Sequence, residues 1–140
     1  MGKKSKSEKA KLRWADAPAE HDYPAASAFL RLITAPALAQ SLAGLLQQAP
    51  LVHQAGKDIL RAARLPLLPS GDPEVAKDLK KVTKGTPLAP VLLIRGDLHT
   101  DRPLQIADGY HRVCASYHLD EDAEIPCQLV DPPTISVTGA

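Results

Sequence analysis

The stretch that decides the fold spans residues 104–115 and reads LQIADGYHRVCA. Leu104 and Ile106 alternate with smaller or polar neighbours, which predicts a short strand over residues 104–107. After Gly109 the apolar residues recur at helical spacing, which predicts a helix over residues 110–118. Glycine adopts positive φ without steric cost, so Gly109 suits a tight junction between the two elements. The stretch therefore predicts a strand that turns directly into a helix.

The predicted turn carries side chains suited to an anion. The first turn of a helix leaves backbone N–H groups unpaired and has a positive partial charge, so it attracts phosphate or carboxylate groups. Within this turn Gly109 and Tyr110 bring the backbone close to a ligand, Arg112 can offer a bidentate fork, and His111 can add a second donor. Asp108 can act as a metal ligand, a general base or a helix cap. An ordinary structural turn is the alternative interpretation.

Further elements follow on both sides of this turn. The apolar run PVLLIR at residues 90–95 predicts a strand that is covered on both faces. A helix is expected to start at Pro73 with Asp72 as its N-cap and to stop at Gly85. Alternating apolar residues predict a last strand over residues 125–130, and Pro126 favours a place at the sheet edge or at the start of the strand.

The N-terminal part of the chain reads as helical. Apolar residues at three- and four-residue spacing predict one helix from about Pro24, capped by Asp22, and a second from Pro36. A third helix is expected from after Pro50 to Arg64, with a basic stripe on one face. The stripe consists of His53, Lys57, Arg61 and Arg64. It can be a solvated surface, or it can face a phosphate if another phosphate-binding element lies nearby.

Composition narrows the class of protein. The chain has 140 residues, 44% hydrophobic and 24% charged, which suits one globular core. No apolar run is long enough to span a bilayer, and the lysine-rich N-terminus lacks the apolar segment of a secretory signal. The two cysteines, Cys114 and Cys127, have no paired spacing, so we expect a reduced, cytoplasmic protein in which both act as small apolar side chains.

The charge is unevenly distributed. Residues 1–13 carry six basic groups against Glu8, so this tail has a net charge of +5 and the remaining residues have −4. A tail of this kind is expected to be disordered, with nonspecific attachment to nucleic acid or an anionic surface as the alternative. The mildly acidic body lacks the dense basic surface that duplex DNA-binding domains present.

The order of motifs resembles the ParB/sulfiredoxin-like superfamily. The resemblance covers about residues 65–130: an LPLLP segment, an acid-capped helix followed by KGTPLAPVLLIR, the LQIADGYHRVCASYHL stretch and IPCQLV. It implies an α+β domain with a small mixed sheet and packed helices. In that superfamily a Gly-x-His-Arg turn binds nucleotide phosphates, and Gly109 to Arg112 match this pattern. Partners would then be a nucleotide or another small phosphorylated ligand.

Departures from the superfamily narrow the function. Sulfiredoxin has its catalytic cysteine where this chain has Tyr110, so sulfinic acid reduction is not expected. Partition ParB proteins continue into a helix-turn-helix module, for which residues 131–140 leave no room. The free serine kinase branch has an Asp-Gly-His turn that Asp108 and Gly109 match, although Tyr110 replaces its first histidine.

The predicted organisation is a basic tail (residues 1–13), a helical extension (14–64), a ParB/sulfiredoxin-like domain (65–131) and a C-terminal tail (132–140). We expect nucleotide or phosphate-ester binding at Asp108–Arg112, supported by Lys57, Arg61 and Arg64, with ATP, ADP or CTP and Mg²⁺ as ligands. If phosphoryl transfer follows, Asp108 is the base or Mg²⁺ ligand. Glu74 is the candidate second carboxylate, or it only complements its helix dipole.

Two other possibilities complete the predictions. A noncatalytic, DNA-associated or regulatory interaction module that uses the basic tail is the alternative to an enzyme. A metal site between His111 and His118 is disfavoured, because seven helical residues separate the two side chains by about 10 Å of rise. Neither the oligomeric state nor the nucleotide base follows from the sequence.

Overall fold

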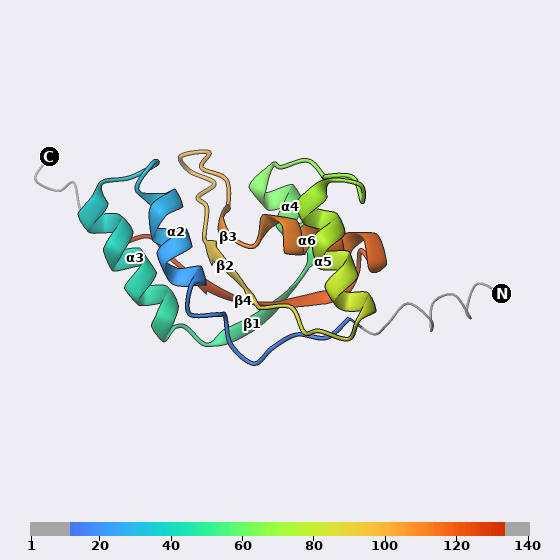
Figure 1. The fold of residues 1–140 in the computed structure, drawn as a ribbon. Helices are drawn as coiled ribbons and strands as arrows, with labels where there is room; N and C mark the ends of the chain where they lie inside the picture. Colours follow the sequence, from blue (N-terminus) through green and yellow to red (C-terminus); the bar gives the residue numbers. More distant parts are fainter. Residues whose placement is uncertain (1–11, 134–140) are drawn as a thin grey trace, which may run out of the picture.

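The computed structural model of the protein describes residues 12–133 (Figure 1). Residues 1–11 and 134–140 lie outside this part, and with them most of the predicted basic tail and C-terminal tail. The described elements follow in the order α2 (Asp22–Leu30), α3 (Pro36–Gln48), β1 (Leu51–Ala55), α4 (Gly56–Ala63), α5 (Pro73–Thr83), β2 (Val91–Ile94), β3 (Gln105–Asp108), α6 (Tyr110–Leu119) and β4 (Glu124–Val130).

The strands form one mixed sheet in the order β1-β4-β2-β3. β4 pairs antiparallel with β1 and parallel with β2, while β2 pairs antiparallel with β3. β2 is buried along its whole length, as the continuous apolar run predicted. The sheet and its helices confirm the expectation of an α+β fold with a small mixed sheet.

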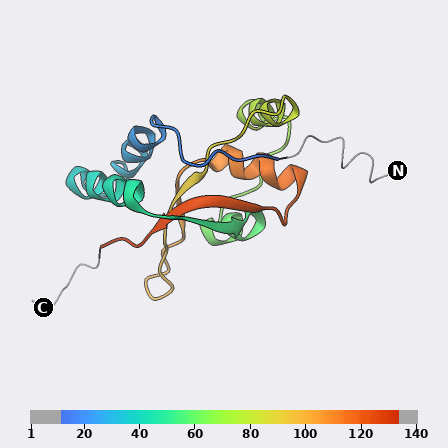
Figure 2. The same cartoon turned by 90° about the horizontal axis from the view of Figure 1, so that it is seen from below.

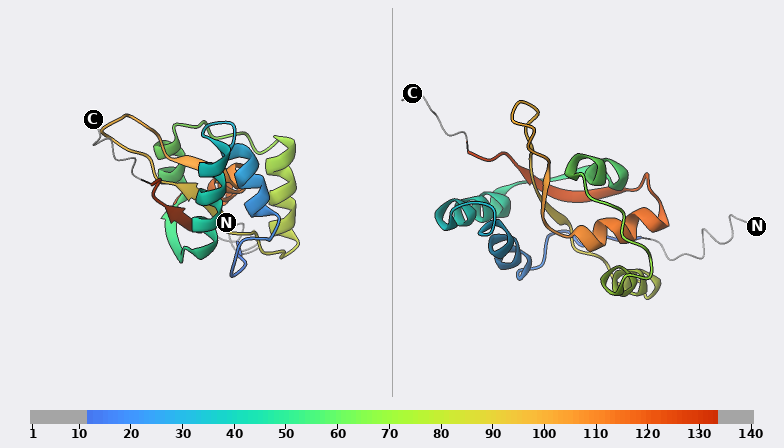
Figure 3. Two further views of the ribbon diagram at one scale, coloured as in Figure 1. Left: turned by 90° about the vertical axis from the view of Figure 1, so that its left-hand side faces the viewer. Right: turned by 90° about the horizontal axis from the view of Figure 1, so that it is seen from above.

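Helices cover both faces of the sheet. α2 and α3 lie on one side, and α4, α5 and α6 lie on the other, which Figure 2 and Figure 3 show from further directions. Neighbouring residues of β2 belong to different core clusters: Leu92 packs with α2 and α3, whereas Leu93 packs with α4 and α6. This follows from the alternation of side chains along a strand.

The predicted helix over residues 51–64 is wrong in its first third. Residues 51–55 form β1, which pairs along its length with β4, and α4 begins only at Gly56. His53 therefore belongs to a strand and not to the helical basic stripe. Because β1 precedes residue 64 and β4 follows it, the predicted extension and the predicted domain share one sheet.

Pro126 does not lie at a sheet edge, because β4 is an inner strand with neighbours on both sides, but it lies near the start of that strand, the other place that the sequence predicts. The proline is tolerated there because the ladder between β4 and β2 starts only at Cys127, opposite Val91. Pro126 faces His53 of β1 on its other side. Proline has no N–H, and Pro126 stands where β4 has no paired residue in β2, so no hydrogen bond between these strands is lost.

Candidate functional site

The strand-to-helix turn forms as predicted. β3 ends at Asp108, Gly109 has a φ of 112°, and α6 begins at Tyr110. A Cβ at Gly109 would lie 2.5 Å from the Val91 Cγ1 atom, so a side chain is excluded by both the backbone angle and the space. The N-cap residue of α6 is Gly109, which has no side chain to cap the helix. The N–H groups of its first turn therefore keep the capacity to bind an anion.

The guanidinium of Arg112 lies against two carboxylates. Its Nη2 atom donates hydrogen bonds to Asp108 Oδ2 and to the Pro90 carbonyl oxygen, each at 3.2 Å. Asp22 Oδ2, from the first residue of α2, lies 3.8 Å from the same nitrogen. The side chain of Arg112 is 17% exposed, and its Nε atom is buried without a hydrogen-bond partner. Part of its charge is thus balanced within the protein.

Asp108 and Asp22 form a close pair of acids at this turn. Burial raises the pKa of Asp108, the Arg112 guanidinium opposes that shift, and the neighbouring Asp22 adds to it. Asp22 is itself buried, and its Oδ2 atom accepts a hydrogen bond from the Ala19 N–H at 3.0 Å. A carboxyl group whose pKa is raised in this way binds and releases a proton nearer to neutral pH, as a general base must.

A third acid comes from α5, which packs against α6. Asp78 is buried, and this burial raises its pKa, while Lys81, Arg112 and His111 oppose the shift. The predicted carboxylate of this helix, Glu74, instead lies at the surface, where it pairs with Lys77 at 3.6 Å. The acid that α5 presents toward the turn is therefore Asp78, one helical turn further along the chain.

Sequence reasoning missed Asp22 and Asp78 as members of the site. Asp22 was assigned as a helix cap, but it forms no cap hydrogen bond and is the first residue of α2. A usable signal existed for Asp78, because it lies between Val75 and Val82 at the spacing of the buried face. A charged residue on an apolar stripe needs a polar partner. Lys81 Nζ lies 3.8 Å from Asp78 Oδ1, and Arg112 supplies a further positive charge nearby.

Tyr110 and His111 differ in how firmly they are held. The Tyr110 hydroxyl donates a 2.6 Å hydrogen bond to the Pro66 carbonyl oxygen, which ties the start of α6 to the extended segment 65–69. His111 has its ring 5.6 Å from the Tyr110 ring and makes no side-chain hydrogen bond within the described residues. The His111 ring is thus one side-chain donor of this turn that remains available to a ligand.

The predicted basic stripe does not act as one surface. Lys57 pairs with Asp122 at 2.6 Å, and Arg64 pairs with Asp101 at the same distance. Arg61 and Arg64 line a pocket beside α4, and none of residues 108–112 lines that pocket. The structure therefore brings Asp108, Tyr110, His111 and Arg112 together with Asp22 and Asp78, without the stripe.

The described residues contain no preformed metal site and no membrane-spanning helix. Among residues 12–133, no group of three or more His, Cys, Asp or Glu side chains is placed to hold a metal ion. Mg²⁺ commonly uses only one or two carboxylates together with phosphate oxygens, so Asp108 can serve as a ligand only in company with a bound phosphate. No helix within the described part of the chain is long and apolar enough to cross a membrane.

Comparisons with known proteins leave the family open. Scans of family models, curated proteins and solved structures each found no match to this chain. The resemblance to the ParB/sulfiredoxin-like superfamily accordingly rests on the motifs of residues 65–130 alone.

Proposed function

We propose that the turn at Asp108–Arg112 binds a phosphorylated small molecule, with a nucleotide and Mg²⁺ as the expected form. The observation that carries this proposal is the uncapped start of α6, which lies beside a mostly buried arginine and a pair of carboxylates. The ParB/sulfiredoxin-like resemblance supports the same assignment, because its Gly-x-His-Arg turn corresponds to Gly109–Arg112.

Each side chain has a role in this proposal. The N–H groups after Gly109 bind phosphate oxygens, and His111 adds a hydrogen bond. Within the described residues, the hydrogen bonds of the Arg112 guanidinium use Nη2, so its Nη1 atom can donate to a second phosphate oxygen. Asp108 and Asp22 repel a bare phosphate, which is why we expect binding to require a cation between carboxylate and phosphate.

Phosphoryl transfer is the activity that this arrangement would support. Asp108 accepts the proton of an acceptor hydroxyl group, since burial raises its pKa. Asp22 shares the guanidinium of Arg112 with Asp108 and fixes its position. Catalysis would then consist mainly of positioning and of charge neutralisation, as in other phosphoryl-transfer enzymes.

Calorimetry with ATP, ADP, CTP and GTP, with and without Mg²⁺, tests the proposal. At least one nucleotide is expected to bind in the presence of Mg²⁺, and His111→Ala is expected to weaken it about tenfold, the loss of one charge-assisted hydrogen bond. His111 is suited to this test because no side-chain hydrogen bond of the described residues depends on it. His53→Ala, on the exposed part of β1, is the matched control and should bind as the parent does.

Two results contradict the proposal. One is that no nucleotide binds with or without Mg²⁺, while the protein is folded. The other is that His111→Ala and Arg112→Gln bind as tightly as the parent. Salt-sensitive retention of DNA by the same samples would favour the noncatalytic, DNA-associated module instead.

A further inference from the structure

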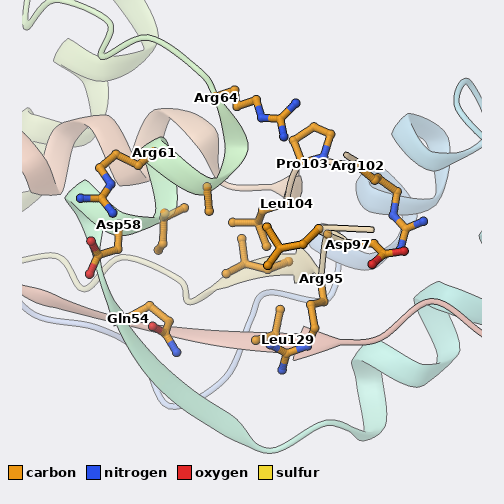
Figure 4. Close-up of a pocket in the computed structure, with 15 residues that line it drawn as sticks. Gln54, Asp58, Arg61, Arg64, Arg95, Asp97, Arg102, Pro103, Leu104 and Leu129 are labelled. Atoms are coloured by element: carbon orange, nitrogen blue, oxygen red, sulfur yellow. The ribbon is translucent and has the colours of Figure 1, made fainter. Parts of the chain in front are cut away.

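A pocket of about 620 Å³ lies on the α4 side of the sheet, away from the turn described above (Figure 4). Its walls are α4, the ends of β2 and β4, and the loop that joins β2 to β3. This volume lies in the range of small-molecule sites. None of residues 108–112 takes part in it, so it is a separate cavity.

Four arginines line this pocket: Arg61 and Arg64 from the end of α4, Arg95 from the end of β2, and Arg102 from the loop. They come from three segments of the chain, and Figure 4 shows them around the cavity. Asp58 and Asp97 are the acids of the lining, and Asp101 and Asp131 pair with Arg64 and Arg95 from outside it. Guanidinium groups are the side chains best matched to phosphate and carboxylate, through paired N–H donors.

Two of the four arginines have no ion pair with any residue that the structure describes. Arg64 pairs with Asp101, and Arg95 pairs with Asp131. Within residues 12–133, no carboxylate lies within 4.0 Å of the guanidinium groups of Arg61 and Arg102. The side-chain oxygens of Asp97 accept hydrogen bonds from the His99 N–H and the Thr100 hydroxyl, each at 3.1 Å. These bonds lower the pKa of Asp97, and the charge of Arg102 adds to this shift.

The loop that carries Arg102 is held in a tight and partly strained shape. A Cβ at Gly96 would lie 2.3 Å from the Arg102 carbonyl oxygen, so only glycine fits there. Arg64 and Asp101 are the two non-glycine residues of positive φ in the described chain, at 57° and 59°. They are also each other's partners, with 2.6 Å between Arg64 Nη2 and Asp101 Oδ1. Strained residues of this kind persist where the surrounding structure fixes them, often at ligand sites.

A backbone contact also fixes the distance between the two walls. The Leu104 N–H donates a 3.0 Å hydrogen bond to the Ala62 carbonyl oxygen, which joins the base of the loop to α4. Together with the Arg64–Asp101 pair, this gives two ties across the pocket. The arginines are thus presented from walls that need little rearrangement on binding, which reduces the entropic cost of binding.

The base of the pocket is apolar. Leu93 of β2, Leu104, which directly precedes β3, and Leu129 of β4 contribute their side chains to it. A ligand that only carried charge would leave this surface in contact with water. An organic group on the same ligand would cover it and gain from the burial of apolar area.

We propose that this pocket binds a phosphate monoester whose organic group is aromatic or otherwise apolar. The phosphate is dianionic near neutral pH, and within residues 12–133 Arg61 and Arg102 are the two lining guanidinium groups without an ion pair that can meet this charge. Arg61 and Arg102 contact the phosphate, and the leucines contact the organic group. This site is independent of the turn proposed above, and either can exist without the other.

Backbone NMR titration with phenyl phosphate tests the site, with inorganic phosphate and phenol as separate arms. Phenyl phosphate is expected to shift the amide signals of residues 61–64 and 95–98 and of Arg102 and Leu104, and to bind more tightly than either partial ligand. Arg61→Ala and Arg102→Ala are each expected to weaken binding about tenfold, because each removes one charge-assisted contact. Arg31→Ala, on the other side of the sheet, is the control of equal charge and should have no effect.

Both variants are expected to fold, since neither Arg61 nor Arg102 forms an ion pair within the described structure. Three results overturn the proposal: phenyl phosphate fails to bind, inorganic phosphate binds as tightly as the ester, or both arginine variants bind as the parent does. A fourth result, shifts confined to residues 108–112, would place the ligand at the turn and would refute this pocket. Conversely, loss of nucleotide binding in His111→Ala leaves the pocket unaffected.

Discussion

Asp78 is a buried carboxylate, and keeping it charged in the folded state costs free energy. Burial raises its pKa above the ordinary value of 3.8, although Lys81, Arg112 and His111 oppose this shift. A carboxyl group with a raised pKa binds its proton more tightly in the folded state than in the unfolded chain. Its contribution therefore favours folding most below its ordinary pKa and becomes unfavourable as pH rises through the folded pKa.

The substitution Asp78→Asn is accordingly expected to stabilise the protein at pH 7. The gain should be at most about 1 kcal/mol, because Lys81, 3.8 Å from the carboxylate, and the nearby Arg112 offset part of the cost of burying its charge. It should disappear as pH falls below the ordinary carboxyl pKa. Urea unfolding at pH 7 and at pH 3.5 measures this difference. Glu74→Gln on the same helix is the control, and an equal gain there, or a gain at pH 3.5 alone, would contradict the argument.

At the scale of single residues, the sequence predicts which residue types serve the turn, but not which side chains they contact. Gly109 is predicted from its place between two periodic segments, and its φ of 112° confirms that expectation. The contacts of Arg112 could not be predicted, because Asp22 is far away in the sequence and α2 must pack on β3 before the two meet. Both cysteines are buried, as their apolar positions indicated, and burial raises the pKa of Cys127 to about 11.

Local signals determine the start of α5. The Asp72 side chain accepts hydrogen bonds from the N–H groups of Glu74 and Val75, at 3.0 and 3.1 Å, and Pro73 occupies the first helical position. Asp72→Ala removes both acceptors and should lower the free energy of unfolding by about 1 kcal/mol. Urea denaturation measures the loss. Ser70→Ala, in the exposed turn before the cap, is the control, and an equal effect of both substitutions would show that the cap hydrogen bonds are not its cause.

The prediction of a helix over residues 51–55 was wrong because a distant strand, and not a local signal, determines the structure there. Residues 51–64 read as one helix because their apolar residues fit a helical period, but β4 offers a strand edge to residues 51–55. A Cβ at Gly56 would lie 3.3 Å from Ile125 Cδ1, so glycine lets the start of α4 pack closely against β4. Pairing with a strand some 70 residues away is a tertiary effect, and it overrides local periodicity. Elements bounded by Pro and Gly, such as α5 and β2, were predicted because their limits are local.

At the scale of the whole molecule, two core clusters share one sheet. Leu92 and Leu93 are neighbours on β2 and are almost fully buried, at 0% and 1% exposure, but they face different helical layers. If the sheet couples the layers into one cooperative unit, loss of packing on either face destabilises both. Each of Leu92→Ala and Leu93→Ala should then lower the free energy of unfolding by about 2–5 kcal/mol.

Trp14 allows this coupling to be measured. It is the single tryptophan of the chain, and it packs against the cluster that contains Leu93 and not against the one that contains Leu92. In a cooperative unit, Leu92→Ala shifts the fluorescence transition of Trp14 in urea as far as it shifts the helical circular dichroism signal. If α2 and α3 instead unfold separately, Leu92→Ala leaves the Trp14 transition where it is in the parent protein and splits the circular dichroism curve in two. The shared sheet predicts the first result, because β4 and β2 lie in the middle of the sheet and contribute side chains to both clusters.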